Sequence, residues 1–370
     1  MLAALSVVAW RLTAFKLARQ PLFIDFLAMW TGGRAAHARP ASAYDFAAID
    51  RAQAWLLGAG VHDRPFPYPP GALLIFEPLG RLPFWAAAWT WILLTGAAFA
   101  VVIWSLLPRP RGLGLGLVAL TPGVVWAAFS GQIAFLIGAL AIGGVALLRR
   151  RPLLAGALIG LAAAIKPTVL IMAPVALIAG GHWRALLASG VAGLAVILAS
   201  AAVFGTAPWF AWIAVAPSYL AHITHNPRFF TSIVAPGGLA AQLGVDGLGL
   251  TLWRGAFALL GLAVVILVFR RTGELAPRLT ALFGASLLAS PYAMNYETTL
   301  LAPGAVLALL AAPAERAAWF SLAAFIGLAV AGFPGVSAAA FLAFLALALG
   351  PTLVAGRRDA ASSREAAPVP

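Results

Sequence analysis

The chain has 370 residues, of which 63% are hydrophobic and 9% are charged, and its mean hydropathy is +0.97. Apolar runs close to the ~20 residues that cross a bilayer recur along it, which excludes a water-soluble globular domain and predicts an all-α polytopic transmembrane bundle. The net charge is +13, but the arginines stand between apolar runs and mark topology, so no nucleic acid is expected as a partner. Because the chain has no cysteine, disulfides and thiolate chemistry are excluded as well.

The basic residues predict the orientation of the chain. Successive basic clusters are separated by an even number of predicted crossings, so all of them can share the cytoplasmic face under the positive-inside rule. The clusters are Arg109 and Arg111, Arg149 to Arg151, Arg184, Arg270, Arg271 and Arg278, Arg316, and Arg357 and Arg358. The other connections then face outward, and we expect the chemistry there: 20–83, 130–132, 166–167, 205–236, 290–297 and 333–335.

The predicted spans are 84–107, 112–129, 133–148, 152–165, 168–180, 185–204, 250–269, 279–289, 298–312, 317–332 and 336–355. Several fall short of a simple spanning length, which implies tilt, shielding by neighbours or local thinning of the bilayer. With an interrupted first helix over 2–17, the count is about 10–12 spans. We expect one transmembrane domain over 1–356, with 20–83 as its first outer loop and 205–236 as a second outer segment. A polar, disordered cytoplasmic tail is expected over 357–370.

The first outer loop is unusually polar for this chain. It contains five of the 11 acidic residues, and ionisable groups near lipid are costly to keep, so the loop is a candidate working part. Apolar positions at helical spacing predict two amphipathic helices on the membrane surface, over 24–38 and 44–57. The proline-rich run 65–70 forces a stiff, extended path that we expect to present Phe66 and Tyr68 at the interface.

A series of short elements follows in a fixed order along the chain. They are Asp25-Phe26, Tyr44-Asp45, Tyr68-Pro69-Pro70 leading into Pro78, Leu79, Leu82 and Pro83, then Gly131-Gln132, Lys166-Pro167 and Ser290-Pro291. Each element is weak alone, but the ordered set resembles glycosyltransferase family 87, once catalogued as domain of unknown function 2029. The resemblance extends roughly from Asp25 to Pro303.

The resemblance implies the GT-C membrane fold and transfer of a single hexose, mannose in similar enzymes. The donor would be a polyprenyl-phosphate sugar and the acceptor a hydroxyl on a glycolipid or glycan, at the outer face of the inner membrane. Such transfer needs a base for the hydroxyl proton as the anomeric carbon becomes cation-like. In the GT-C pattern an acidic residue early in the first outer loop takes this role, with inversion, and Asp25 stands at that place. The alternative is that Asp25 only caps the helix after it.

Four residues are candidates for binding the donor phosphate. Lys166 lies between short apolar runs, where an unpaired ammonium is costly, so it should either snorkel to the interface or meet an anion. Arg228 and His225 belong to a second polar group, in which the arginine would supply the charge; a solvated loop is the other interpretation. Gln132 can hydrogen-bond a phosphate or sugar oxygen, or cap the next helix.

The remaining candidates are assigned to the substrate pocket. Tyr44, Asp45 and Tyr68 come from the first outer loop, although Asp45 also reads as a helix start with a capping preference. The 290–297 turn adds Tyr292, Asn295, Tyr296 and Glu297 to this pocket. Family members carry histidines after the Ser-Pro element, so this departure leaves the acceptor open, and with it the question whether Glu297 assists Asp25.

Two alternatives come from other functional classes. A lipid-carrier flippase or secondary transporter would show internal repeats or charged residues near the midplane, and here the carboxylates concentrate in an outer loop. A ligase for preassembled glycans would differ only in what it transfers. No obligatory cofactor and no metal ligands are predicted, although a divalent metal requirement stays open; membrane lipid and the lipid-linked sugar are the expected partners.

Overall fold

A computed structural model describes residues 7, 11, 14–15, 17–18, 21–57, 64–226, 229, 232–311, 316–331, 341–346 and 348–350. This part of the chain is 82% helical and contains no strand, which confirms the all-α membrane bundle. The expectations for most of 2–17, for the 333–335 turn, for Arg228 and for the tail 357–370 lie outside the described residues.

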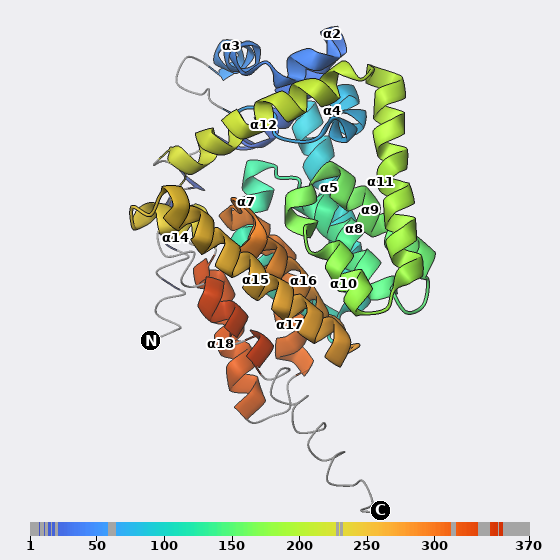
Figure 1. Ribbon diagram of the computed structural model, residues 1–370, viewed down its shortest axis with the longest axis vertical. Helices are drawn as coiled ribbons and strands as arrows, with labels where there is room; N and C mark the ends of the chain where they lie inside the picture. The colour runs from blue at the N-terminus through green and yellow to red at the C-terminus, as the bar shows by residue number, and fades with distance from the viewer. Residues whose placement is uncertain are drawn as a thin grey trace, which may run out of the picture.

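The elements are arranged in one bundle (Figure 1). They are α2 (Phe26–Ala38), η1 (Pro40–Tyr44), α3 (Phe46–Leu57), η2 (Pro70–Ala72), α4 (Leu73–Gly80), α5 (Phe84–Leu106), α6 (Arg111–Ala119), α7 (Pro122–Ser130), α8 (Ala134–Leu147), α9 (Pro152–Ile165), η3 (Pro167–Leu170), α10 (Ala173–Ala179), α11 (Trp183–Phe204), α12 (Ala207–His225), α14 (Pro236–Gln242), α15 (Gly247–Arg271), α16 (Leu275–Ala289), η4 (Asn295–Leu300), α17 (Ala302–Ala311) and α18 (Arg316–Ala331).

Among the described residues, three helices are long and apolar enough to cross a membrane: α5, α11 and α15. The pair α6 and α7, bent by 67°, makes a fourth if it forms one span. Shorter apolar helices are also present, α8, α9 and α16 among them. The total of 10–12 crossings stays a prediction.

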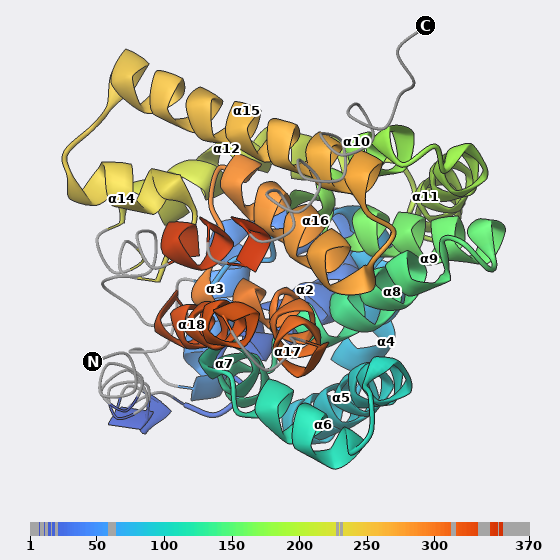
Figure 2. The same ribbon diagram turned by 90° about the horizontal axis from the view of Figure 1, so that it is seen from below.

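The long helices surround the short ones. Seen from below, α15 lies on one flank and α5 with α6 on the opposite flank, with α16 and α17 between them (Figure 2). In the other view α12 lies across one end of the bundle, above α5, α8 and α9 (Figure 1). That end is where the helices α9 and α16 finish and where the polar turns after them gather.

Helices α9 and α11 run side by side at backbone contact. A Cβ atom at Gly156 would lie 2.1 Å from the carbonyl oxygen of Ala185, and one at Gly160 would lie 2.2 Å from that of Ser189. The two contacts advance together along both helices, so α9 and α11 are parallel. Small residues permit such close packing in lipid, where dispersion contacts rather than the hydrophobic effect hold helices together.

The first outer loop differs from its predicted form. Helix α2 is buried over Phe26–Gly33 instead of lying on the membrane surface, and it packs against α4. Phe66 and Tyr68 are 0% and 6% exposed, so the proline-rich run presents them to the core and not to the interface. Only α3 keeps the expected pattern, with Ile49 buried and Arg51 exposed.

Two other segments also correct the expectation. The second outer segment, for which no helix was predicted, contains the 19-residue helix α12. A hydrogen bond of 3.2 Å from Trp212 Nε1 to the carbonyl of Pro67 connects this helix to the proline-rich run. The predicted span 168–180 is divided into η3 and α10. The division falls at Ile171 and Met172, before Pro174, whose ring removes the backbone donor that a continuous helix would direct at the Leu170 carbonyl.

The crossing of α2 and α4 yields a stability prediction. A Cβ atom at Gly33 would lie 1.8 Å from the carbonyl oxygen of Phe76, so Gly33→Ala must push two backbones apart and should cost about 1–3 kcal/mol. Gly116→Ala is the control, because that Cβ meets nothing within 4 Å and alanine favours the helix. Thermal unfolding in detergent, followed by tryptophan fluorescence, measures both; equal midpoints would contradict the close crossing.

Candidate active site

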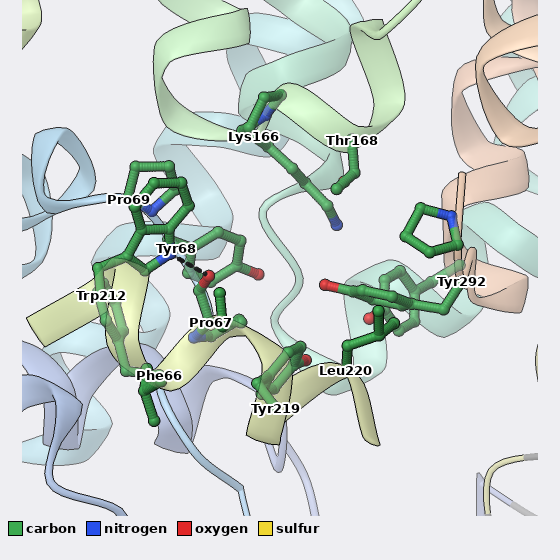
Figure 3. Close-up of a pocket in the computed structure, with 15 residues that line it drawn as sticks. Phe66, Pro67, Tyr68, Pro69, Lys166, Thr168, Trp212, Tyr219, Leu220 and Tyr292 are labelled. Carbon is green, nitrogen blue, oxygen red and sulfur yellow. Dashed lines mark hydrogen bonds between the residues drawn. The ribbon is translucent and has the colours of Figure 1, made fainter. Parts of the chain in front are cut away.

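A cavity of about 220 Å³ lies beneath α12 at the end of the bundle where α9 and α16 finish (Figure 3). Three segments far apart in the sequence converge on it: the proline-rich run, the Lys166-Pro167 turn and the 290–297 turn, with α12 forming the remaining wall. Its lining residues are Phe66, Pro67, Tyr68, Pro69, Lys166, Pro167, Thr168, Trp212, Val215, Ala216, Tyr219, Leu220, Pro291, Tyr292 and Tyr296. The cavity is therefore mainly apolar and aromatic, with one cation.

That cation is held by a buried ion pair. Lys166 points into the cavity from the end of α9 (Figure 3), and its Nζ lies 2.7 Å from Oε1 of Glu297. The side chains of Lys166 and Glu297 are 9% and 2% exposed. Nζ also lies 5.9 Å and 5.2 Å from the ring centroids of Tyr68 and Tyr296, so both rings make cation–π interactions with the ammonium group. Of the two expectations for Lys166, burial against an anion holds and snorkelling does not.

The 290–297 turn is built to present Glu297. The backbone of Ser232 to Ala235 pairs with that of Ala293 to Asn295, including a bond of 2.8 Å from Asn295 N–H to the Ser232 carbonyl. Glu297 Oε2 then accepts the Met294 N–H at 3.2 Å, which leaves Oε1 for Lys166. The ion pair thus joins the end of α9 to the start of η4.

Four phenols surround the cavity. Burial is the main cause that raises the pKa of Tyr68, Tyr219, Tyr292 and Tyr296, and the charge of Glu297 raises each further. All four stay neutral at physiological pH. They can donate hydrogen bonds to sugar or phosphate oxygens, but they do not act as bases.

The backbone of Asp25 is fixed against the end of α7. The N–H of Phe23 donates to the carbonyl of Phe129 at 2.8 Å and that of Asp25 to Ser130 at 3.0 Å, so the chain pairs with the end of α7. Phe23 has a positive φ of 61°, an uncommon conformation for a non-glycine residue. Its ring packs edge-on against Trp89, with centroids 4.9 Å apart, which helps to hold the bend.

The carboxylate of Asp25 pairs with Arg64 and makes no capping bond to α2, so the capping alternative is not what the side chain does. Asp25 is not among the lining residues of the cavity, but its charge is one cause of the raised pKa of Tyr68, Tyr219 and Tyr296. Arg64 itself lines a second recess of about 300 Å³. This recess is formed by Phe46, Ala47, Ile49, Asp50, Arg64, Pro65 and His222.

The other first-loop candidates have structural roles. Tyr44 donates a hydrogen bond of 2.9 Å from its hydroxyl to the carbonyl of Tyr68, and so supports the cavity wall from outside. Asp45 is exposed and its Oδ1 accepts the Ala48 N–H at 3.0 Å, the helix-start role that the sequence also allowed.

The predicted phosphate group is not assembled as a set. His225 is exposed at the end of α12, with Nδ1 3.0 Å from the carbonyl of Ala221. Gln132 is buried outside the cavity lining and does not cap α8, whose start has no side-chain capping bond. Asn295 is buried in the turn, where its Oδ1 accepts the Tyr296 N–H at 2.9 Å. Within the described residues, Gln132 Oε1 and Asn295 Nδ2 have no hydrogen-bond partner.

The sequence reading missed three residues of this site. Arg64 was available as the cation immediately before the proline-rich run in an acidic loop. Trp212 and Tyr219 lie on α12, and no helix was predicted over 205–236. In the structure Pro208 occupies the first turn of α12, where its missing N–H costs nothing, and Pro217 lies inside the helix.

The buried ion pair gives a second stability prediction. Lys166→Met and Glu297→Gln each leave one buried charge uncompensated and should cost about 3–5 kcal/mol, whereas the double variant should lose much less than the sum. Arg81→Met is the control, because Arg81 is 58% exposed and pairs with Glu77 at 2.7 Å, and Glu77 keeps His37 as a second partner when Arg81 is removed. This variant should lose less than about 1 kcal/mol of stability. Thermal unfolding of all four variants measures these losses. If the loss in the double variant equals the sum of the two single losses, Lys166 and Glu297 are not energetically coupled.

The chain was compared with known proteins. The profile of glycosyltransferase family 87 matches residues 66–291, which include Tyr68 and Lys166 and exclude Asp25 and Glu297. No curated protein and no solved structure matches the chain. The match spans more than half of the sequence, and the chain belongs to glycosyltransferase family 87.

Proposed function

We propose that this membrane glycosyltransferase moves a single hexose, mannose by family resemblance, from a polyprenyl-phosphate donor to an acceptor hydroxyl with inversion. The observation that carries the proposal is a buried cation in an aromatic cavity, three of whose tyrosines also feel the charge of the Asp25 carboxylate. The reaction is assigned to the outer face of the inner membrane and the scaffold to the GT-C type.

The cavity suits the donor. Its proline, aromatic and aliphatic lining favours an isoprenoid or a sugar ring, and Lys166 can balance the phosphate charge. Glu297 fills that position here, at 2.7 Å from Nζ. Donor binding would therefore shift Lys166 partly from Glu297 to the phosphate, while the neutral tyrosines donate to the remaining oxygens.

Asp25 is assigned the general base. It would take the acceptor hydroxyl proton as that oxygen bonds to the anomeric carbon, while the bond from this carbon to the phosphate oxygen breaks and polyprenyl phosphate leaves with the electron pair. Arg64 positions the Asp25 carboxylate and lines the second recess, which is more polar than the cavity. We assign this recess to the approach of the acceptor.

Two alternatives are weaker. Membership in a glycosyltransferase family favours an enzyme over a flippase or transporter. Transfer of a preassembled glycan would need more space than a cavity of about 220 Å³ offers, which favours a single sugar.

The base is tested by Asp25→Asn with Asp45→Asn as the control. Both remove one carboxylate from the first outer loop, and Asn keeps the capping ability of Asp45. Release of polyprenyl phosphate from polyprenyl-phosphate mannose should fall at least ~100-fold in Asp25→Asn and stay near normal in Asp45→Asn. Normal turnover by folded Asp25→Asn would contradict the assignment of Asp25 as the base. If the parent chain and both variants all fail to release polyprenyl phosphate, polyprenyl-phosphate mannose is not the donor.

The orientation is tested by single cysteines in this cysteine-free chain. Ala47 in α3 and Arg150 after α8 are both exposed, and the positive-inside rule assigns them to opposite faces. In intact cells an impermeant maleimide added at the periplasmic side should label Ala47→Cys. Arg150→Cys should react only after the inner membrane is permeabilised, and the reverse pattern would turn the site to the cytoplasm.

A further inference from the structure

An open recess of about 430 Å³ lies at the end of the bundle opposite the active-site cavity. Helices α9 and α16 each finish at the cavity, and this recess lies where α8 and α15 end and where α11 and α16 begin. Its polar lining consists of Arg149, His182, Arg270, Arg271, Thr272 and Arg278, and no carboxylate from the described part of the chain lines it. Four arginines therefore converge on one hollow, and Arg278 is the buried one among them.

Arg278 is the fixed centre of this arginine recess. It is only 8% exposed, and its guanidinium is held by neutral groups. Nε donates to the carbonyl of Thr272 at 2.7 Å, Nη2 donates to that of Phe269 at 3.3 Å, and Nη1 lies 3.1 Å from Nε2 of His182. These bonds orient the guanidinium, and none of these three partners carries a negative charge.

The pKa of the neighbouring His182 is affected by the same positive charges. Burial lowers the pKa of His182, and the charges of Arg278 and Arg149 lower it further. His182 is thus neutral at pH 7 and accepts the hydrogen bond from Arg278. The only carboxylate near these elements along the chain, Glu274, is exposed, and its backbone N–H is bonded to Thr272 Oγ1 at 3.0 Å.

We propose that the arginine recess binds a phosphate-ester group, carried by an anionic phospholipid of the cytoplasmic leaflet. Guanidinium groups match phosphate oxygens in geometry and charge, and basic hollows between transmembrane helices at the cytoplasmic side suit anionic headgroups. The positive-inside rule alone requires basic residues on that side. It does not require a buried arginine in a hollow without a carboxylate.

The test compares lipids and paired variants by native mass spectrometry of the purified chain. Phosphatidylglycerol is titrated against phosphatidylcholine, and inorganic phosphate is added separately. Arg149→Gln/Arg270→Gln removes two recess arginines, and Arg109→Gln/Arg184→Gln removes two exposed arginines of the same predicted face outside it. We expect phosphatidylglycerol binding to weaken about 10-fold or more in the first variant and to change little in the second.

Three outcomes are informative. Loss of phosphatidylglycerol preference in the recess variant alone supports a lipid phosphate. Binding of inorganic phosphate that the same variant loses, without any lipid preference, supports the phosphate site and assigns it to the free ion. Equal binding by both variants, or no preference for either phosphate over phosphatidylcholine, overturns the proposal. Should Arg149→Gln/Arg270→Gln unfold, Arg149→Lys/Arg270→Gln and the two single variants repeat the comparison.

Discussion

The catalytic end of the molecule depends on how one ammonium group is kept out of water. Lys166 ends α9 in an apolar bundle, and an uncompensated charge there would cost several kcal/mol. Glu297 compensates it only because the backbone pairing around Met294 holds the 290–297 turn in place. The faces of Tyr68 and Tyr296 complete the surroundings. Segments more than 200 residues apart are thus joined at one charge, and the cavity takes its shape from that junction.

Much of this end could be predicted from the sequence. Chain order and the alternation of basic clusters brought Tyr68, Lys166, Tyr292 and Tyr296 to one side, and all four line the cavity. The topology argument works because charge in lipid is costly wherever it occurs, so few positions remain for it. Packing inside the first outer loop was not predictable in the same way. Helix α2 is apolar on most faces and has adjacent glycines, so its pattern does not say which side is covered.

Pairings between distant residues were also beyond the sequence. The pairing of Asp25 with Arg64 joins residues 39 positions apart, and nothing in the spacing distinguished Arg64 from other cations. Helix α12 was not predicted, although one of its two prolines, Pro208, occupies the first turn, where proline is tolerated. The family profile covers 66–291, so the two carboxylates assigned to the site lie outside it on either side. Asp25 comes from the segment before the matched region and Glu297 from the segment after it.

The parallel packing of α9 and α11 determines how deep Lys166 lies in the bilayer. A Cβ atom at Gly71 would lie 2.6 Å from Val196 Cγ1 and 3.6 Å from the Ala164 carbonyl, so the end of α9 is level with Val196. From there to Phe204, where α11 ends, the helix rises about 12 Å. With α11 spanning the bilayer, Lys166 lies well below the headgroups, within one half of the hydrocarbon layer. A sugar phosphate must descend to it, or the bilayer must be thinner over α12, and the rate of transfer would then depend on membrane thickness.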